Sequence, residues 1–324
     1  MNPDASAAVS DPRILIVPQT SRGYGGLSKE CRATARDCPQ IRSITHIVDH
    51  TVTFAVQRPD AVPLPGGLAW EEEADTEGRP GRGLVRWVLR IDHAMQELDT
   101  GELMRTLVVT AGGGIQCSRL HSGQYLVGIS ESGAGCAPMD EAMNRMVSKI
   151  RQERHLTDEL PGGRPGEVIE PFVAESPLLM QVLTRDAEEE HRLRAIWHRH
   201  LNPTDLHYAA YYRNWSLVCV GDTFDHQELD DTFGRVTAPA RRARYRDLVC
   251  RLQNELDTLG SIIEPVTRDP VRRLVLDVVE GAFYMHWLDG AEGEFVVGVT
   301  FRQPKVAVAE QRLRKLVKEV RAPR

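Results

Sequence analysis

One stretch of the sequence has an order of residues suited to anion binding: ILIVPQTSRGYGGLSKE, from Ile14 to Glu30. It predicts an apolar strand, a loop carrying Gly23, Gly25 and Gly26, and a helix that begins near Ser28. Such a helix start directs backbone N–H groups at a phosphate. The loop matches neither GxxxxGK[ST] nor GxGxxG, and Ser28 could simply cap the helix. Phosphate or nucleotide binding here is therefore an alternative to a plain connection.

Cys117 and His121 are residue types that could form a nucleophile and its base. Both fall in one predicted strand, where residues four positions apart are about 13 Å apart. That separation excludes a hydrogen bond between the two side chains. We therefore expect no catalytic pair at these positions.

Histidines gather in HRLRAIWHRHLNPTDLH, at His191, His198, His200 and His207. Metal ligands on one helix face recur at steps of three or four, whereas His198 and His200 are two apart and diverge by roughly 200°. We expect a solvated helix face here, with no metal site.

Arginines such as Arg32, Arg36 and Arg42 could act as an arginine finger toward a GTPase, but solvated charged faces are the simpler interpretation. Trp70 is different, because it stands beside Glu71 to Glu73 in a Pro-rich stretch. A large aromatic side chain with flanking charge is typical of protein interfaces. Trp70 is therefore our candidate partner contact, the alternative being that it packs on its own domain.

Composition narrows the class of protein. The chain has 324 residues, a net charge of −6 and interspersed basic and acidic residues. Nucleic-acid binding would favour a basic stripe, so we expect no nucleic-acid partner. The sequence has no apolar run of the length that spans a bilayer and no signal peptide at its start, so we expect no membrane insertion. Six scattered cysteines without CxxC predict free thiols, hence a cytoplasmic location.

Two segments far apart in the sequence resemble each other. LVVTAGGGIQCSRLHSGQYLVGIS, from Leu107, matches LVLDVVEGAFYMHWLDGAEGEFVVGVT, from Leu274. Leu107 matches Leu274 and Gly114 matches Gly281 at the same separation in the sequence. Gly128 matches Gly298 at a slightly longer separation. Insertion at a hairpin tip explains the change of spacing. The triple glycine Gly112–Gly114 is then a hairpin turn rather than a ligand loop.

The elements before and after these segments also correspond. Apolar residues at helical spacing predict helices over 84–98 and 243–259, and two more after Pro138 and Pro304. The segments 48–56 and 212–220 each predict two strands around a polar turn, Asp49-His50 or Arg213-Asn214. Helices are expected over 27–38 and 178–201. The predicted fold is therefore α+β: two repeated units, each an antiparallel five-stranded sheet flanked by helices on both faces.

This order of elements resembles the Roadblock / dynein light-chain superfamily, which is related to longin and profilin-like domains. The resemblance rests on LVVTAGGGIQCSRLHSGQYLVGIS with DEAMNRMVSKI, and on GEFVVGVTFRQPKVAVAEQRLRKLV. It implies a scaffold or regulator, often of a Ras-like GTPase, whose domains pair edge to edge or helix to helix. Two departures are a Pro/Gly-rich acidic insert, 58–83, and an extra strand, 14–18.

The predicted organisation is a disordered tail (1–12), a first unit (13–156), a linker (157–177) and a second unit (178–324), with the units docked on each other. The function that we expect is a non-enzymatic adaptor or regulator that binds a protein partner such as a small GTPase, without cofactor or metal. The alternatives are a nucleotide- or phosphate-binding protein or enzyme using Gly23–Ser28, and a small-ligand sensory module. A nucleotide-binding protein would be distinguished from an adaptor by thermal stabilisation with nucleotide.

Overall fold

The computed structural model describes residues 11–17, 23–62, 64–65, 73–157, 159–169, 178–233, 236–288 and 293–322. These residues form an α+β fold around one twelve-stranded sheet, in which all neighbouring strands are antiparallel. Trp70 and residues 1–10 of the predicted tail lie outside the described residues.

The strands divide into two sets of six. The first set is β1 (Arg13–Ile16), β2 (Ser43–Val48), β3 (Thr51–Gln57), β4 (Leu103–Val109), β5 (Gly114–His121) and β6 (Gln124–Ser130). The second is β7 (Leu179–Val182), β8 (Tyr208–Arg213), β9 (Ser216–Asp222), β10 (Arg273–Val278), β11 (Gly281–Trp287) and β12 (Phe295–Thr300). Across the sheet the order is β1-β3-β2-β6-β5-β4-β10-β11-β12-β8-β9-β7. From each outer edge of the sheet toward its centre, the strands of a set follow one order: the first, third, second, sixth, fifth and fourth strand of that set.

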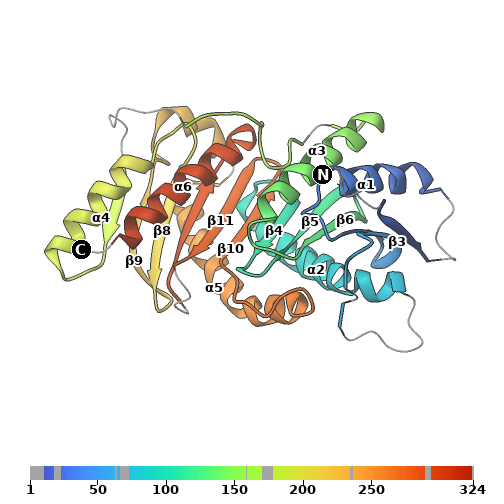
Figure 1. Ribbon diagram of the computed structural model, residues 1–324. Coiled ribbons are helices and arrows are strands. Elements are labelled where there is room, and N and C mark those ends of the chain that lie inside the picture. Colours follow the sequence, from blue (N-terminus) through green and yellow to red (C-terminus); the bar gives the residue numbers. More distant parts are fainter. Residues whose placement is uncertain are drawn as a thin grey trace, which may run out of the picture.

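Helices cover both faces of the sheet (Figure 1). The described α-helices are α1 (Gly25–Asp37), α2 (Glu73–Met95), α3 (Cys136–Glu153), α4 (Ala187–His200), α5 (Ala238–Ile263) and α6 (Val306–Arg321). Helices α2 and α5 pack against each other on one face, whereas α1 packs with α3 and α4 with α6 on the other. None of these helices combines the length and apolar content needed to cross a lipid bilayer.

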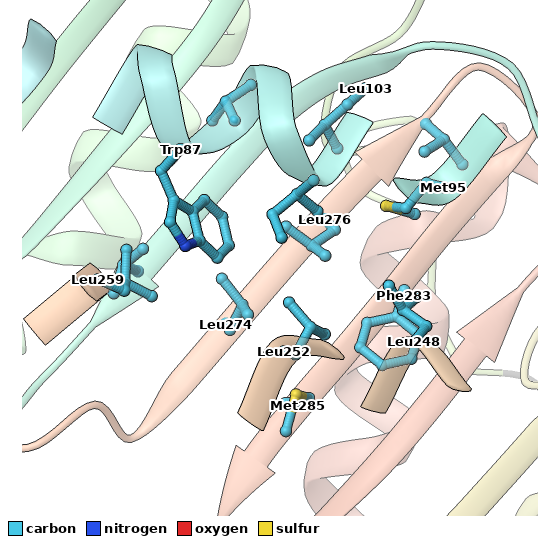
Figure 2. Close-up of a cluster of buried hydrophobic side chains, with 14 of the residues drawn as sticks. Trp87, Met95, Leu103, Leu248, Leu252, Leu259, Leu274, Leu276, Phe283 and Met285 are labelled. Carbon is cyan, nitrogen blue, oxygen red and sulfur yellow. The ribbon is translucent and has the colours of Figure 1, made fainter. Parts of the chain in front are cut away.

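Each face of the sheet has its own hydrophobic core, and both cores continue from one set of strands into the other. At the junction, Trp87 of α2 and Leu252 of α5 gather with side chains of β4, β10 and β11, among them Leu274 (Figure 2). The junction itself is the antiparallel pair β4–β10, where Leu107 lies opposite Val275. Burying apolar area across this pair makes the two sets of strands one packed body.

The structure corrects the expected register between the two matched segments of the sequence. Leu107 belongs to the core under α3 and α6, whereas Leu274 belongs to the core under α2 and α5. The predicted match of Leu107 with Leu274 therefore pairs positions on opposite faces. Val275, the next residue along the strand, shares the core of Leu107. A slip of one residue reverses the face of every side chain in a strand, which apolar character alone does not reveal.

Two predicted elements of the second half are wrong in detail. The helix expected over 178–201 is instead strand β7 followed by α4, because the Asp186 side chain accepts hydrogen bonds from the N–H groups of Glu188 and Glu189 and so starts the helix there. The second hairpin turns at Asn214 and Trp215, with φ of 49° and 60°, rather than at Arg213-Asn214. The first turn, Asp49-His50, is confirmed, with φ of 45° and 68°.

Helix α2 begins at Glu73, inside the stretch 58–83 that we predicted to be an insert before the helix. This segment contains Gly and Pro, which are unfavourable in a helix, yet it forms one because its glycines allow close packing on the sheet. A Cβ on Gly78 would lie 2.4 Å from Val52 Cγ2, and one on Gly81 would lie 3.1 Å from Ile47 Cδ1. Only glycine lets α2 approach the sheet so closely, and the packing gained there overrides the weak helix propensity.

Candidate protein interface

The predicted anion loop proves to be partly helical. Gly25 and Gly26 form the first turn of α1, and Gly23 precedes it with φ of 109°. Ser28 does not cap the helix: its hydroxyl donates to the Gly25 carbonyl at 3.1 Å. Among the described residues, no side chain caps this helix start, and a Cβ on Gly23, Gly25 or Gly26 would meet no atom within 4 Å. The turn is thus an open helix start without a P-loop lysine.

Cys117 and His121 do not form a pair that could do chemistry. The Cys117 side chain is buried in the core under α2, and burial raises the pKa of its thiol. His121 lies at the far end of β5, where its Nδ1 is 2.9 Å from the Ser122 carbonyl oxygen. Gly112 and Gly113 lie in the hairpin connection between β4 and β5, as predicted, and Gly114 is the first residue of β5.

The four histidines point in different directions. His191 and His198 are exposed on α4, as predicted. His200 and His207 are buried instead, which corrects the solvated face expected for them. His200 Nε2 is 2.9 Å from Glu319, and His207 Nδ1 accepts the Phe301 N–H at 3.1 Å. No group of three His, Cys, Asp or Glu side chains suited to a metal occurs among the described residues.

The three arginines considered as an arginine finger are engaged within the chain. Arg42 is 2% exposed and donates from Nε to Glu77 at 3.1 Å, and it also pairs with Glu131. Arg32 pairs with Asp11, and Arg36 with Asp37. Arg42 is therefore a structural residue of the fold, because a buried guanidinium cannot reach a partner.

One hollow on the α2/α5 side lies at the C-terminal end of α5, and we call it the α5 groove. Its volume is about 790 Å³, and its apolar walls are Trp215, Leu256, Val271 and Trp287. Trp215 comes from the β8–β9 turn and is half-buried, and its ring centroid is 4.8 Å from that of Phe295. Trp287 ends β11 and is 9% exposed. The groove thus presents two tryptophans held by the core beneath them.

Charged residues form the rim of this groove. Asp257, Glu264, Arg268, Asp269 and Arg272 all line it. Glu264 and Arg268 lie 3.8 Å apart and are mostly exposed, so their attraction is weak in water. Both charges therefore remain available to a partner. Aromatic anchors inside a polar rim are the arrangement found at the centres of protein interfaces.

A second hollow occupies the corresponding place beside α2, and we call it the α2 pocket. Its volume is about 280 Å³, and His50, Val88, Asp92, Arg119 and Gly123 line it. Arg119 pairs with Glu102 across its mouth, and Asp92 accepts the Leu103 N–H at 2.6 Å. These polar contacts fill and narrow the pocket.

The two hollows are lined by matching positions. Seven pairs of lining residues keep one constant spacing in the sequence: Val85 and Gln253, Val88 and Leu256, Leu89 and Asp257, Asp92 and Gly260, Glu102 and Pro270, Leu103 and Val271, and Arg119 and Trp287. The α5 groove is wider because Gly260 and Pro270 supply no carboxylate where the α2 pocket has Asp92 and Glu102. Arg119, which narrows the α2 pocket, is matched in the α5 groove by Trp287, whose side chain is an apolar wall.

No protein-family model matches the chain, and no similar sequence is found among curated proteins. The groove residues Trp215 and Trp287 were not identified from the sequence. The turn predicted at Arg213-Asn214 placed Trp215 in a strand, where aromatic residues are common, so its position in the sequence gave no signal.

Proposed function

We propose that the chain is an internal duplication of a Roadblock-like unit, in which each copy has the five expected strands and one added edge strand. The duplication is supported by the distance along the chain between a β-bulge and the turn after it, which is the same in both halves. Bulges interrupt the first hairpin of each half between His46 and Ile47 and between Tyr211 and Tyr212. The turns that follow them, at Asp49-His50 and Asn214-Trp215, lie at the same distance beyond the bulge in both halves.

Matching glycines give independent support. A Cβ on Gly128 would press on Met143 of α3, at 3.1 Å from its Sδ, and one on Gly298 would press on Leu313 of α6, at 2.7 Å from Cδ2. Each glycine precedes the helix residue that it touches by the same number of positions. Unrelated halves would have no reason to place the same close contact at the same spacing.

The function that this geometry supports best is that of a non-enzymatic adaptor or regulator acting through protein–protein interaction. The observation that carries it is the pair of matching hollows on the α2/α5 side, one narrowed by ion pairs and one open with two tryptophans. The partner class implied by the Roadblock resemblance is a Ras-like small GTPase. A cytoplasmic location belongs to the same proposal, supported by six free cysteines, five of them buried.

The α5 groove is the surface at which we place the partner. Tryptophan is enriched among the residues that contribute most to binding, because it supplies a large contact area with few rotatable bonds. Trp215 stands at a turn and packs on Phe295, so its side chain is ordered before binding. Binding of a partner over the groove would therefore cost little conformational entropy at the Trp215 side chain.

The test is binding of the purified chain to a panel of Ras-like GTPases, each loaded with GDP or a non-hydrolysable GTP analogue, measured by biolayer interferometry. We expect at least one GTPase to bind, with Trp215→Ala weakening it at least tenfold. The matched control is His50→Ala, which changes the corresponding turn position of the first hairpin, in the α2 pocket. We expect this control to change affinity less than twofold.

Two results would contradict the proposal. If no GTPase bound, a GTPase partner would be excluded for that panel. If binding were equally sensitive to His50→Ala and Trp215→Ala, the α5 groove would not be the specific surface. Thermal stability of both variants must stay close to that of the unchanged chain for the comparison to hold.

A further inference from the structure

Strand β7 has one edge at which no strand of the described residues pairs. It is the last strand of the sheet, and its other side pairs with β9. The Leu183 N–H bonds to the Val218 carbonyl, so by the alternation of antiparallel pairs Gln181 and Leu179 also bond toward β9. The N–H and C=O groups of Met180 and Val182 therefore point away from the sheet, available to a further strand.

The side chains of β7 and of Leu183, the residue that follows it, carry no charge that would oppose pairing. Leu179 is 53% exposed, Leu183 is 50% exposed, and Gln181 between them is uncharged. The opposite edge differs, because Arg13 of β1 reaches Gln57 at 2.8 Å and Glu73 at 3.0 Å. Charged residues protect edges from pairing, whereas an apolar edge invites it.

A hollow of about 210 Å³ adjoins this edge, between β7 and the N-terminal half of α5. Leu179, Tyr208, Val220 and Arg246 are among its lining residues. At the spacing that relates the α2 pocket to the α5 groove, Arg246 corresponds to Gly78, the glycine that lets α2 touch the sheet. Helix α5 thus has a long, exposed side chain that lines the hollow at the position where α2 has a glycine against the sheet.

The charge beside the edge is positive and uncompensated. Arg242 is satisfied, since it donates to Asp222 at 2.7 Å from both Nε and Nη2 and to Asp225 at 2.8 Å. Arg246 and Arg185 are exposed, and neither has an acidic partner among the described residues. A carboxylate placed next to Arg246 would be attracted to it without displacing an existing pair.

We propose that β7 accepts an extended segment of a partner protein as a thirteenth strand, with an Asp or Glu side chain beside Arg246 and apolar side chains against Leu179 and Leu183. The backbone of the segment bonds to Met180 and Val182, which supplies affinity, while the hollow and Arg246 supply specificity. This surface is distinct from the α5 groove, which lies at the other end of the same helix.

The experiment uses the full chain and random nine-residue peptides displayed on phage. We expect selection of sequences that alternate apolar residues and contain Asp or Glu. Synthetic peptides of the selected sequences are then measured by fluorescence anisotropy. Val182→Pro removes an outward N–H without touching a β9 bond, so we expect affinity to fall at least tenfold. Trp215→Ala should leave it within twofold.

Charge reversal makes the test specific. With Arg246→Glu as the target, selection should switch to peptides containing Lys or Arg. Selection of the same acidic peptides by this variant, or undiminished binding to Val182→Pro, would overturn the proposal. So would a selection that yields no alternating peptide from the unchanged chain.

Discussion

Leu107 of β4 and Val275 of β10 face each other as Cα partners across the centre of the twelve-stranded sheet, and both side chains are completely buried. Their spacing in the sequence is the one that relates the α2 pocket to the α5 groove. Under the proposed duplication this pair marks the two-fold axis that relates the copies. A symmetric contact at an edge strand joins the two sheets without leaving an unpaired edge between them.

The first prediction is that the described residues unfold as a single cooperative unit, although the strands divide into two sets. Both cores cross the β4–β10 pair, so neither half can lose its packing alone. Far-UV circular dichroism and tryptophan fluorescence should give coincident melting curves. Leu107→Ala should lower the free energy of unfolding by about 2–5 kcal/mol and shift both curves together. Two resolved transitions would show that the halves are independent.

The second prediction concerns the buried pair of Arg42 and Glu77, each 2% exposed. Gln57 also donates to Glu77, at 3.1 Å. Glu77→Ala should destabilise the chain by about 3–5 kcal/mol in urea denaturation, because it leaves a buried guanidinium without its main carboxylate. The double change Arg42→Met with Glu77→Leu should recover most of this loss. If the double variant were as unstable as the single one, packing rather than charge would be responsible.

The third prediction uses two glycines in helices. Gly78→Ala should destabilise the chain by roughly 1–3 kcal/mol, since its Cβ would lie 2.4 Å from Val52 Cγ2. Gly25→Ala, where a Cβ meets nothing within 4 Å, should be neutral or stabilise by up to about 1 kcal/mol. Val52→Ala should relieve the first substitution. Equal effects of the two single changes in thermal melts would contradict the close-packing explanation.

Patterns of apolar residues predicted most elements of this fold, because alternation and helical spacing report burial directly. These patterns could not give the register between the segments that begin at Leu107 and Leu274. Leu274 and Val275 are equally apolar, and only the packing assigns one to each face. They also missed the first turns of α2, where glycines contribute contacts that no helix propensity records.

The candidate site was harder to predict than the fold. Trp215 and Trp287 are far apart in the chain and line one groove only because the ends of two hairpins lie beside the end of α5. Residues chosen for chemical type, such as Cys117 and His200, proved to be buried parts of the structure. Chemistry can be proposed from residue types, but a surface for a partner depends on tertiary placement.

The last prediction is a loss of stability in mild acid that depends on His207. Burial lowers the pKa of this side chain to about 4, from an ordinary value near 6.5. Its neutral ring is required, because Nδ1 accepts the Phe301 N–H while Nε2 lies 3.0 Å from the Pro203 carbonyl. Between these two values the unfolded chain binds a proton that the folded chain does not, so stability falls as the pH drops from 6.5 toward 4.

A pKa difference of this size lowers the free energy of unfolding by about 3 kcal/mol as the pH falls through that interval. His207→Asn cannot take up the proton, so its stability should decline less steeply with falling pH than that of the unchanged chain. Urea denaturation at several pH values between 4.5 and 7.5 measures both slopes, and other titrating groups cancel in the difference. Parallel curves for the two proteins would mean that His207 already carries its proton in the folded state.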